Sequence, residues 1–130
     1  MHKIPTAIVI DDEIDMMSVF CEYLQMIDIE VVGRGYDGKD AIDLYIQKNP
    51  DIVFLDVMMP KYDGFFALRG IKTIDPAAKV IIFTADTSPE TTKRLHGLEP
   101  HKVIFKPFRA DQIIDTVEGI RNISWPSLVI

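Results

Sequence analysis

The stretch that decides the fold is Ile52-Val53-Phe54-Leu55-Asp56-Val57-Met58-Met59-Pro60. Its four leading apolar residues predict a strand that is covered on both faces, and Asp56 follows them directly. A buried carboxylate without a partner is costly, so we expect this aspartate at the carboxyl end of a core strand. Open α/β sheets place their chemistry at that edge. Asp56 is therefore the first candidate functional residue.

Similar apolar runs recur along the chain, separated by stretches with helical periodicity. The predicted strands span residues 6–10, 29–33, 51–55, 79–83 and 102–105. Strands that alternate with helices predict a parallel sheet covered by helices on both faces. Right-handed crossovers leave few topologies for five such strands. The sequence therefore predicts an α/β protein, a five-stranded parallel sheet of order 2-1-3-4-5 in a (βα)5 flavodoxin-like three-layer sandwich.

Each predicted helix carries an apolar stripe that would face the sheet. The fourth helix is expected to begin at Thr87-Ser88-Pro89-Glu90, where hydroxyl caps, an early proline and an acidic first turn coincide. The stripes of the other helices comprise Ile14, Met17, Phe20, Cys21, Leu24 and Ile27; Ala41, Ile42, Tyr45 and Ile46; Leu68 and Ile71; and Ile113, Ile114, Val117 and Ile120. These patterns predict a single domain.

Two further acids, Asp11 and Asp12, follow the first predicted strand. In the order 2-1-3-4-5 the first and third strands are neighbours, so these acids converge on Asp56. At about 4 Å and an effective dielectric near 20, one such pair of charges costs about 4 kcal/mol. A divalent cation relieves the repulsion, and oxygen ligands suit Mg²⁺. One acid of the pair is expected to contribute to capping the next helix, but capping does not account for all three acids.

The fourth and fifth strands end at Thr84 and Lys106. A hydroxyl and an ammonium beside a carboxylate-bound cation would hold the oxygens of a phosphoryl group. Alone, Thr84 would be an ordinary threonine at a strand end and Lys106 an ordinary surface lysine. Together, at the same edge of one sheet, they predict a phosphoryl-binding site.

These residues, in this order, resemble the receiver (CheY-like) domain of two-component response regulators. The resemblance covers roughly residues 6–122, and it implies a receiver domain over 1–123 and a short tail or linker stub over 124–130. It implies that a histidine kinase or a phosphotransfer protein phosphorylates the acceptor aspartate. The matching positions are Asp11-Asp12, Asp56, Met59-Pro60, Asp63-Gly64, Thr84 and Lys106-Pro107-Phe108.

The resemblance also implies a role for each site residue. Asp12, Asp56 and the backbone carbonyl of Met58 would ligate Mg²⁺ directly, and Asp11 would act mostly through water. Lys106 would pair with the phosphoryl group, and Thr84 would move to hydrogen-bond it. The peptide bond before the proline in Lys106-Pro107 is expected to be cis. A downstream protein target would bind the face of the fourth helix, fifth strand and fifth helix.

The chain departs from the family at that output face. Val103 stands where the family has a switch aromatic, three residues before the lysine. Glu99-Pro100 replaces a Gly-Ala pair, so we expect the fourth helix to end early with Gly97 as its C-cap. Arg109 replaces the usual polar cap of the fifth helix. An altered partner surface and relaxed packing are both open explanations.

Two residues bear on the lifetime of a phosphoryl group. One lies two positions after Asp56, and the other lies two positions after Thr84. Met58 offers no polar group to orient an attacking water, which predicts slow self-dephosphorylation. Asp86 is acidic and could either orient that water or repel it.

Two other functions stay open at this point. An aspartate-nucleophile phosphohydrolase would need a second acid where this chain has Met58, which argues against turnover of external substrates. A degenerate receiver would act as a phosphorylation-independent binding module, but the full set of site residues argues against it. We therefore expect a signalling switch rather than an enzyme, acting as a monomer or weak homodimer.

The bulk composition excludes several other classes. Hydrophobic residues make up 48% and charged residues 26% of the 130 residues, which is typical of a soluble globular protein. A formal charge of −6 without a basic cluster argues against nucleic-acid binding. No apolar stretch approaches the roughly 20 residues of a membrane span. Cys21 is the only cysteine, which excludes an intrachain disulfide and fits a cytoplasmic protein.

Overall fold

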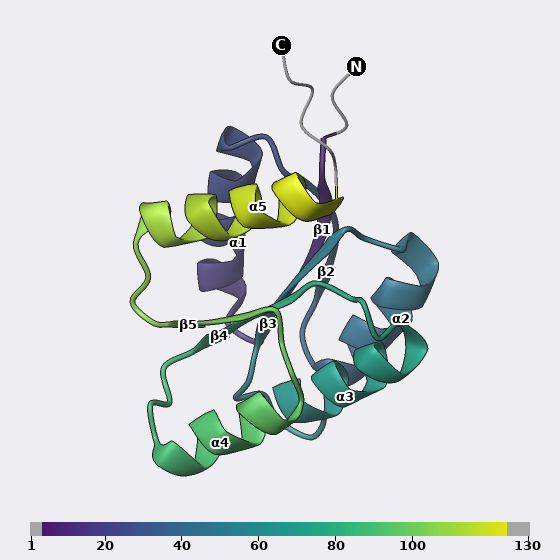
Figure 1. Ribbon diagram of the computed structural model, residues 1–130, viewed down its shortest axis with the longest axis vertical. Helices are drawn as coiled ribbons and strands as arrows, with labels where there is room; N and C mark the ends of the chain where they lie inside the picture. The colour runs from purple at the N-terminus through teal and green to yellow at the C-terminus, as the bar shows by residue number, and fades with distance from the viewer. Residues whose placement is uncertain (1–3, 125–130) are drawn as a thin grey trace.

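The computed structural model describes residues 4–124 of the chain, and in this range five strands alternate with five helices (Figure 1). Most of the expected tail, residues 125–130, lies outside the described residues. The elements are β1 (Thr6–Ile10), α1 (Ile14–Met26), β2 (Glu30–Gly35), α2 (Gly38–Lys48), β3 (Ile52–Asp56), α3 (Gly64–Ile74), β4 (Val80–Thr84), α4 (Pro89–Gly97), β5 (Lys102–Phe105) and α5 (Ala110–Ser124).

The five strands form one parallel sheet in the order β2-β1-β3-β4-β5, which confirms the predicted topology. Four of the strands lie within one residue of their predicted bounds. The exception is β2, which runs to Gly35 instead of residue 33. Its pairing with β1 shifts register between Ala7 and Ile8, so β2 carries one extra residue there.

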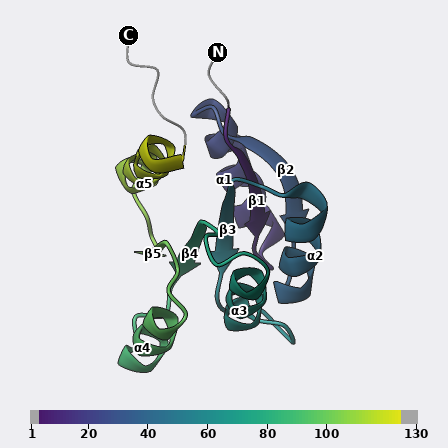
Figure 2. The ribbon, with the colours of Figure 1, turned by 45° about the vertical axis from the view of Figure 1, so that its right-hand side comes forward.

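The helices cover both faces of the sheet, with α1 and α5 on one side and α2, α3 and α4 on the other (Figures 1 and 2). Successive residues of β3 point to opposite faces. Phe54 therefore packs in the core under α1 and α5, while Val53 and Leu55 pack in the core under α2 and α3. The whole of β3 is buried, as its apolar run predicts.

Three predicted core positions are instead exposed. Ile14 is 63% exposed, Ile46 is 62% exposed and Ile114 is 40% exposed. Ile46 and Ile114 each follow a buried residue, Tyr45 and Ile113, and consecutive helical residues are rotated by about 100°. Each of these two helices therefore buries a narrower stripe than the sequence suggests. Ile14 is the first residue of α1, where the helix has only begun.

Helix α4 ends early, as expected, but Gly97 is not its C-cap. Gly97 is the last residue of the helix, the C-cap is Leu98, and no glycine has a positive φ among the described residues. The N–H groups of Leu98 and Glu99 donate to the carbonyls of Leu95 and His96. These hydrogen bonds extend the helix end by two tight turns past Gly97. The residue with left-handed backbone geometry is Glu99, whose φ is 53°.

At the start of α5, side chains of the first turn contact Arg109, the residue that precedes the helix. The backbone N–H of Arg109 donates to Oε1 of Gln112 at 2.8 Å, and the Arg109 guanidinium pairs with Asp111. Gln112, the third residue of the helix, thus satisfies the backbone N–H of the residue that precedes α5, which is one half of a capping box. Across the described residues, no helix is long and apolar enough to cross a membrane.

Candidate functional site

The carboxyl ends of β1, β3, β4 and β5 bring the predicted site residues to one edge of the sheet. Asp11 follows β1, Asp56 and Thr84 end β3 and β4, and Lys106 follows β5. Carboxylate oxygens of Asp11, Asp12 and Asp56 lie within 4.8 Å of one another. The Lys106 ammonium lies 3.4 Å from Oδ2 of Asp11 and 3.8 Å from Oδ2 of Asp56.

Asp56 lies at the centre of this cluster and is only 7% exposed. Burial raises the pKa of its carboxyl to about 6, because desolvation penalises the ionised form. The Lys106 ammonium lowers this pKa and the Asp11 carboxylate raises it again. Hydrogen bonds from the backbone N–H groups of Val57, at 2.8 Å, and Met58 favour the ionised form. Keeping Asp56 ionised therefore costs free energy, and an added positive charge in the site would reduce that cost.

The acid pair after β1 does not cap α1. The N-cap of this helix is Glu13, whose side chain makes no capping hydrogen bond. Asp11 instead accepts a hydrogen bond from the Glu13 N–H at 2.9 Å through Oδ1, while its Oδ2 faces Lys106. The expectation that one acid caps the helix is therefore wrong, since the loop geometry turns Asp11 toward the cluster.

The loop after β3 is held under the site by Gly64. The Gly64 N–H donates to the carbonyl of Val57 at 2.9 Å. A Cβ atom at residue 64 would meet the carbonyl oxygen of Asp56 and would lie 2.6 Å from Cα of Val57. Only glycine permits this approach of α3 to the Asp56 backbone. Asp63 then caps α3 by accepting from the Phe66 N–H at 3.0 Å, which gives the Asp63-Gly64 pair a structural role.

Thr84 is fully buried, and its hydroxyl oxygen accepts the backbone N–H of Asp86 at 3.0 Å. The Asp86 carboxylate is also engaged. It accepts the Ser88 N–H at 2.8 Å and the Thr91 hydroxyl at 2.7 Å. Asp86 therefore turns toward the start of α4, a connection that the sequence pattern did not indicate.

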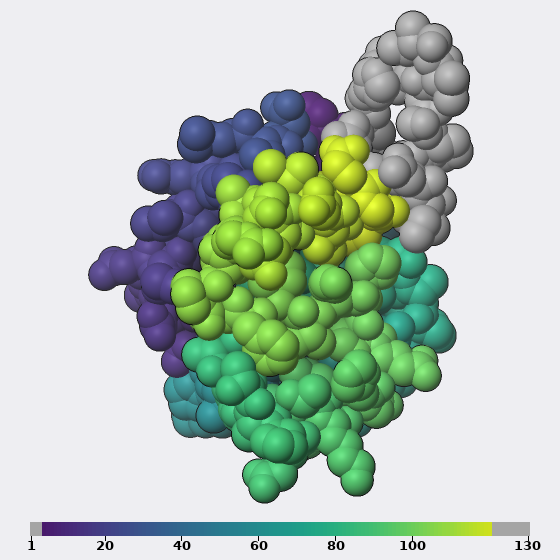
Figure 3. Space-filling model, turned by 60° about the vertical axis from the view of Figure 1, so that its left-hand side comes forward, coloured from purple at the N-terminus to yellow at the C-terminus, as the bar shows by residue number. Residues whose placement is uncertain are grey.

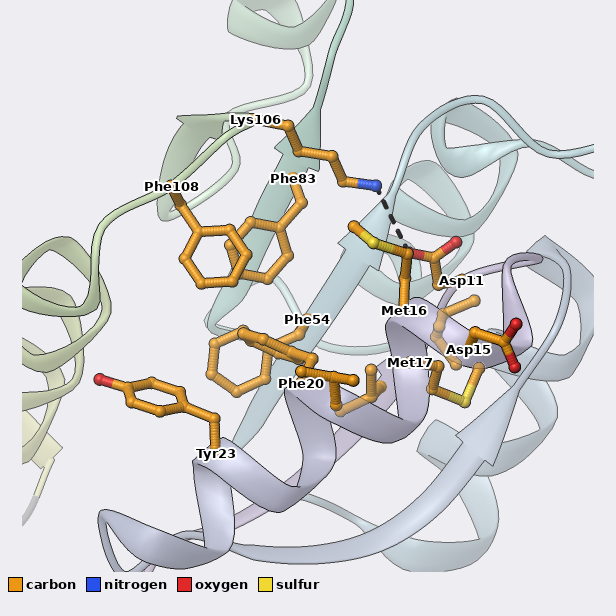
Figure 4. A pocket seen from close by; sticks show the side chains of 13 residues that line it. Asp11, Asp15, Met16, Met17, Phe20, Tyr23, Phe54, Phe83, Lys106 and Phe108 are labelled. Carbon is orange, nitrogen blue, oxygen red and sulfur yellow. Dashed lines mark hydrogen bonds and ion pairs between the residues drawn. The ribbon is translucent and has the colours of Figure 1, made fainter.

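The Lys106–Pro107 bond is cis, as the resemblance implied. The next residue, Phe108, packs against Phe20 and Phe83 at ring-centre distances of 5.4 and 5.2 Å. These rings border an apolar cavity of about 420 Å³ between α1 and the loop after β5 (Figure 4). Asp11 and Lys106 also line it, so the cavity adjoins the site. Phe20 was expected in the core from its helical spacing, but the cavity beside it could not be predicted from the sequence.

On the face formed by α4, β5 and α5, Val103 is half-buried against the core under α2 and α3. A second cavity of about 520 Å³ lies between α4 and β5, and Val103, Phe105 and Leu95 all line it. Phe105 is 39% exposed and lies two residues after Val103, on the same face of the strand. The structure thus has an aromatic ring in this groove, at a position the sequence analysis did not consider.

The donor set fits a divalent cation. Three carboxylates carry three negative charges, and Lys106 supplies one positive charge at 3.4 and 3.8 Å from two of them. All the side-chain ligands are hard oxygens, which Mg²⁺ prefers over softer metals. A nitrogen- or sulfur-ligated metal has no donor in this cluster.

Comparison with known proteins agrees with this geometry. Residues 7–118 match the response regulator receiver domain family. The chain is 34% identical to Protein CcdB of Bacillus subtilis, over 87% of this chain and 94% of that protein. It is 33% identical to the chemotaxis protein CheY of Listeria monocytogenes, over 85% of this chain and 93% of that protein.

Solved structures give the same result. A LuxR-family two-component response regulator from Aurantimonas superposes with a TM-score of 0.84 at 23% identity, covering 91% of this chain and 85% of that one, which shows the fold. A CheX–CheY–BeF3–Mg complex from Borrelia burgdorferi has a TM-score of 0.81 at 25% identity, covering 88% of this chain and 87% of that one. Receiver domains bind Mg²⁺ at an acidic pocket, where this chain has its aspartate cluster. The chain belongs to the response regulator receiver domain family of two-component signalling.

Proposed function

We propose that this chain is a phosphoacceptor switch in which Asp56 receives a phosphoryl group from a histidine kinase or a phosphotransfer protein. One observation carries the proposal. The buried Asp56 carboxylate lies in a cluster with Asp11 and Asp12, and the Lys106 ammonium is 3.8 Å from it. A nucleophilic carboxylate beside a cation site and a fixed ammonium is suited to phosphoryl transfer, because positioning and charge stabilisation supply most of the catalysis.

Each neighbour of Asp56 then has a distinct task. Asp12, Asp56 and the carbonyl of Met58 would hold Mg²⁺ directly, with Asp11 acting mostly through water. The bound cation would neutralise charge on the phosphoryl oxygens and on the carboxylates. Lys106 would exchange its contact with Asp11 for one with the phosphoryl group, and Thr84 would turn its hydroxyl to the same group.

The expected result of phosphorylation is a change in the surface that binds a partner protein. Phosphorylation adds about −1.5 to −2 charges and new acceptor oxygens next to the loop after β4. We expect a downstream protein to bind the face of α4, β5 and α5 (Figure 3), and the protein to act in the cytoplasm as a monomer or weak homodimer. The CheX–CheY–BeF3–Mg complex is a structural neighbour in which a related domain is bound to another protein.

Phosphorylation with a small phosphodonor such as acetyl phosphate tests the proposal. The protein with Mg²⁺ should gain one phosphoryl group, measured as an acid-stable, hydroxylamine-labile mass increase. Asp56→Asn should abolish the gain, and Asp43→Asn, which alters an exposed aspartate of α2, should leave it unchanged. Labelling that survives Asp56→Asn at full stoichiometry contradicts the proposal.

The same preparation separates the switch from a phosphohydrolase. Met58, two residues after Asp56, is 61% exposed and has no polar side-chain group to activate water. We therefore propose stoichiometric labelling and slow loss of the phosphoryl group, with no sustained hydrolysis of phosphate esters. Continuous turnover would favour the hydrolase, and a phosphoryl lifetime of seconds would overturn the assignment to Met58.

A further inference from the structure

A chain of hydrogen bonds joins Thr84 to the first turn of α4. The Asp86 N–H donates to Oγ1 of Thr84 at 3.0 Å. The Asp86 carboxylate accepts the Ser88 N–H at 2.8 Å through Oδ1 and the Thr91 hydroxyl at 2.7 Å through Oδ2. Ser88 in turn caps the helix by accepting the Thr91 N–H at 3.3 Å. One aspartate thus contacts both the strand-end hydroxyl and the helix.

The Asp86 carboxylate is suited to this role because it is ionised at neutral pH. The hydrogen bonds from Thr91 and Ser88 hold the pKa of Asp86 below its ordinary value. An ionised carboxylate accepts stronger hydrogen bonds than a neutral one, and both of its oxygens are used here. Thr91 is the third residue of α4, so the contact holds the helix itself and not only the loop before it.

Few other contacts fix the position of α4 against the rest of the domain. Leu95 is its only buried residue. The Arg94 guanidinium lies 3.9 Å from the ring centre of Phe65 on α3, which holds the far end of the helix. The first turn is therefore held mainly through Asp86 and Ser88. An element with so little buried apolar surface is one whose position a local change can shift.

Val103 stands at the position of the family's switch aromatic and provides no ring that could relay movement of Thr84. Val103 is half-buried, and its short branched side chain cannot exchange a ring between buried and exposed positions. A rearrangement at Thr84 still breaks or strains the bond that its oxygen accepts from Asp86. Because the Asp86 backbone and carboxylate belong to one residue, a shift of its N–H also displaces the groups bound to its carboxylate.

We propose that Asp86 is the positioning residue that couples Thr84 to α4, so that the hydrogen bonds to Thr91 and Ser88 carry the response of the site to the output face. The coupling rests on the proposed phosphoacceptor function for its trigger, but the bonds themselves exist in the unmodified protein. Asp86 acts in this coupling as a positioning residue, through Thr84 and α4, and both of its carboxylate oxygens accept hydrogen bonds from the start of the helix.

The matched pair Thr91→Val and Thr91→Ser tests the coupling by NMR, because only the serine keeps the hydroxyl that Asp86 accepts. In the unmodified protein, Thr91→Val should shift the amide signals of Thr84 and Asp86, and Thr91→Ser should leave them close to wild type. Thr87→Val removes a hydroxyl from an exposed side chain of the same loop and should cause no such shift at Thr84. Equal spectra for the valine and serine variants at Thr84 and Asp86 would overturn the proposal.

A second arm uses beryllium fluoride with Mg²⁺ as the phosphoryl mimic. Bound fluoride and the Val57 amide report occupancy of Asp56, and the amides of α4 report the output. With occupancy equal, the shifts of α4 should be at least about twofold smaller in Thr91→Val and Asp86→Ala than in wild type and Thr91→Ser. If the α4 amide signals shift as far in both Thr91→Val and Asp86→Ala as in the wild type, the coupling is overturned. Absence of bound fluoride in the wild type counts against the phosphoacceptor function instead, and the first arm still decides the coupling.

Discussion

At the scale of single residues, Asp56 shows how a functional group costs stability. Its carboxyl titrates near 3.8 when exposed and at about 6 in the folded protein. The folded state therefore binds this proton more tightly than the unfolded state does. Stability falls as pH rises through that interval and the cost is complete above pH 6. In the proposed function, this cost keeps a nucleophilic carboxylate beside Lys106.

Asp56→Asn should consequently stabilise the metal-free protein. At pH 7.5, in a chelating buffer, we expect the free energy of unfolding in urea to rise by up to about 3 kcal/mol, because asparagine removes the buried charge. Near pH 4 the gain should shrink toward zero, because the wild-type carboxyl is then protonated. Asp43→Asn, which changes an exposed charge, should do little at either pH. A loss of stability in Asp56→Asn at pH 7.5 would contradict this account.

Residues of the site differ in how far the sequence could predict them. Topology alone places four of them together, because Asp56 ends an apolar strand and the others follow one: Asp11, Asp12 and Lys106. Asp86 belongs to a loop, and its bonds to Thr91 and Ser88 depend on backbone angles that no spacing rule specifies. Strand ends could therefore be predicted from periodicity, while the hydrogen bonds between the loop after β4 and α4 could not.

At the scale of elements, the sequence predicted which segments are strands and helices better than where each one ends. Runs of buried apolar residues specify β1, β3 and β4 because packing on both faces admits only such residues. The end of α4 depends instead on turn geometry. Gly97 looked like a left-handed cap from its type alone, yet its neighbours Leu98 and Glu99 make the turn.

Gly97→Ala distinguishes the two descriptions of this helix end. Gly97 is helical, and an added Cβ meets no atom within 4 Å. Alanine should therefore stabilise the protein by roughly 0.5–1 kcal/mol in chemical denaturation, because it favours the helix more than glycine does. Gly119→Ala in α5, with equally open surroundings, is the matched control and should behave alike. A left-handed cap at Gly97 would instead make the alanine destabilising.

At the scale of the whole molecule, the site lies where the two halves of the core meet. Asp11 follows β1 and Asp56 ends the neighbouring strand β3. Both strands contribute side chains to the core under α1 and α5 and to the core under α2 and α3. The three carboxylates converge only when this central pair is formed. The unfolded chain separates Asp12 from Asp56 and has no equivalent cluster, so a cation that binds the cluster binds the folded state selectively.

Magnesium should therefore raise the thermal stability of the entire domain. At a concentration of about 100 times its dissociation constant, selective binding contributes about 2.7 kcal/mol, or a rise in melting temperature of roughly 10 °C. Asp12→Asn should reduce the rise, and Asp43→Asn should retain it. Sodium chloride at equal ionic strength controls for screening, and an equal rise with sodium would show that no specific site is filled.

Asp56→Asn should be more stable than the wild type without Mg²⁺, because the buried charge is gone. It should gain less stability when Mg²⁺ is added, because the charge that destabilises the metal-free cluster is also the charge that would bind the cation.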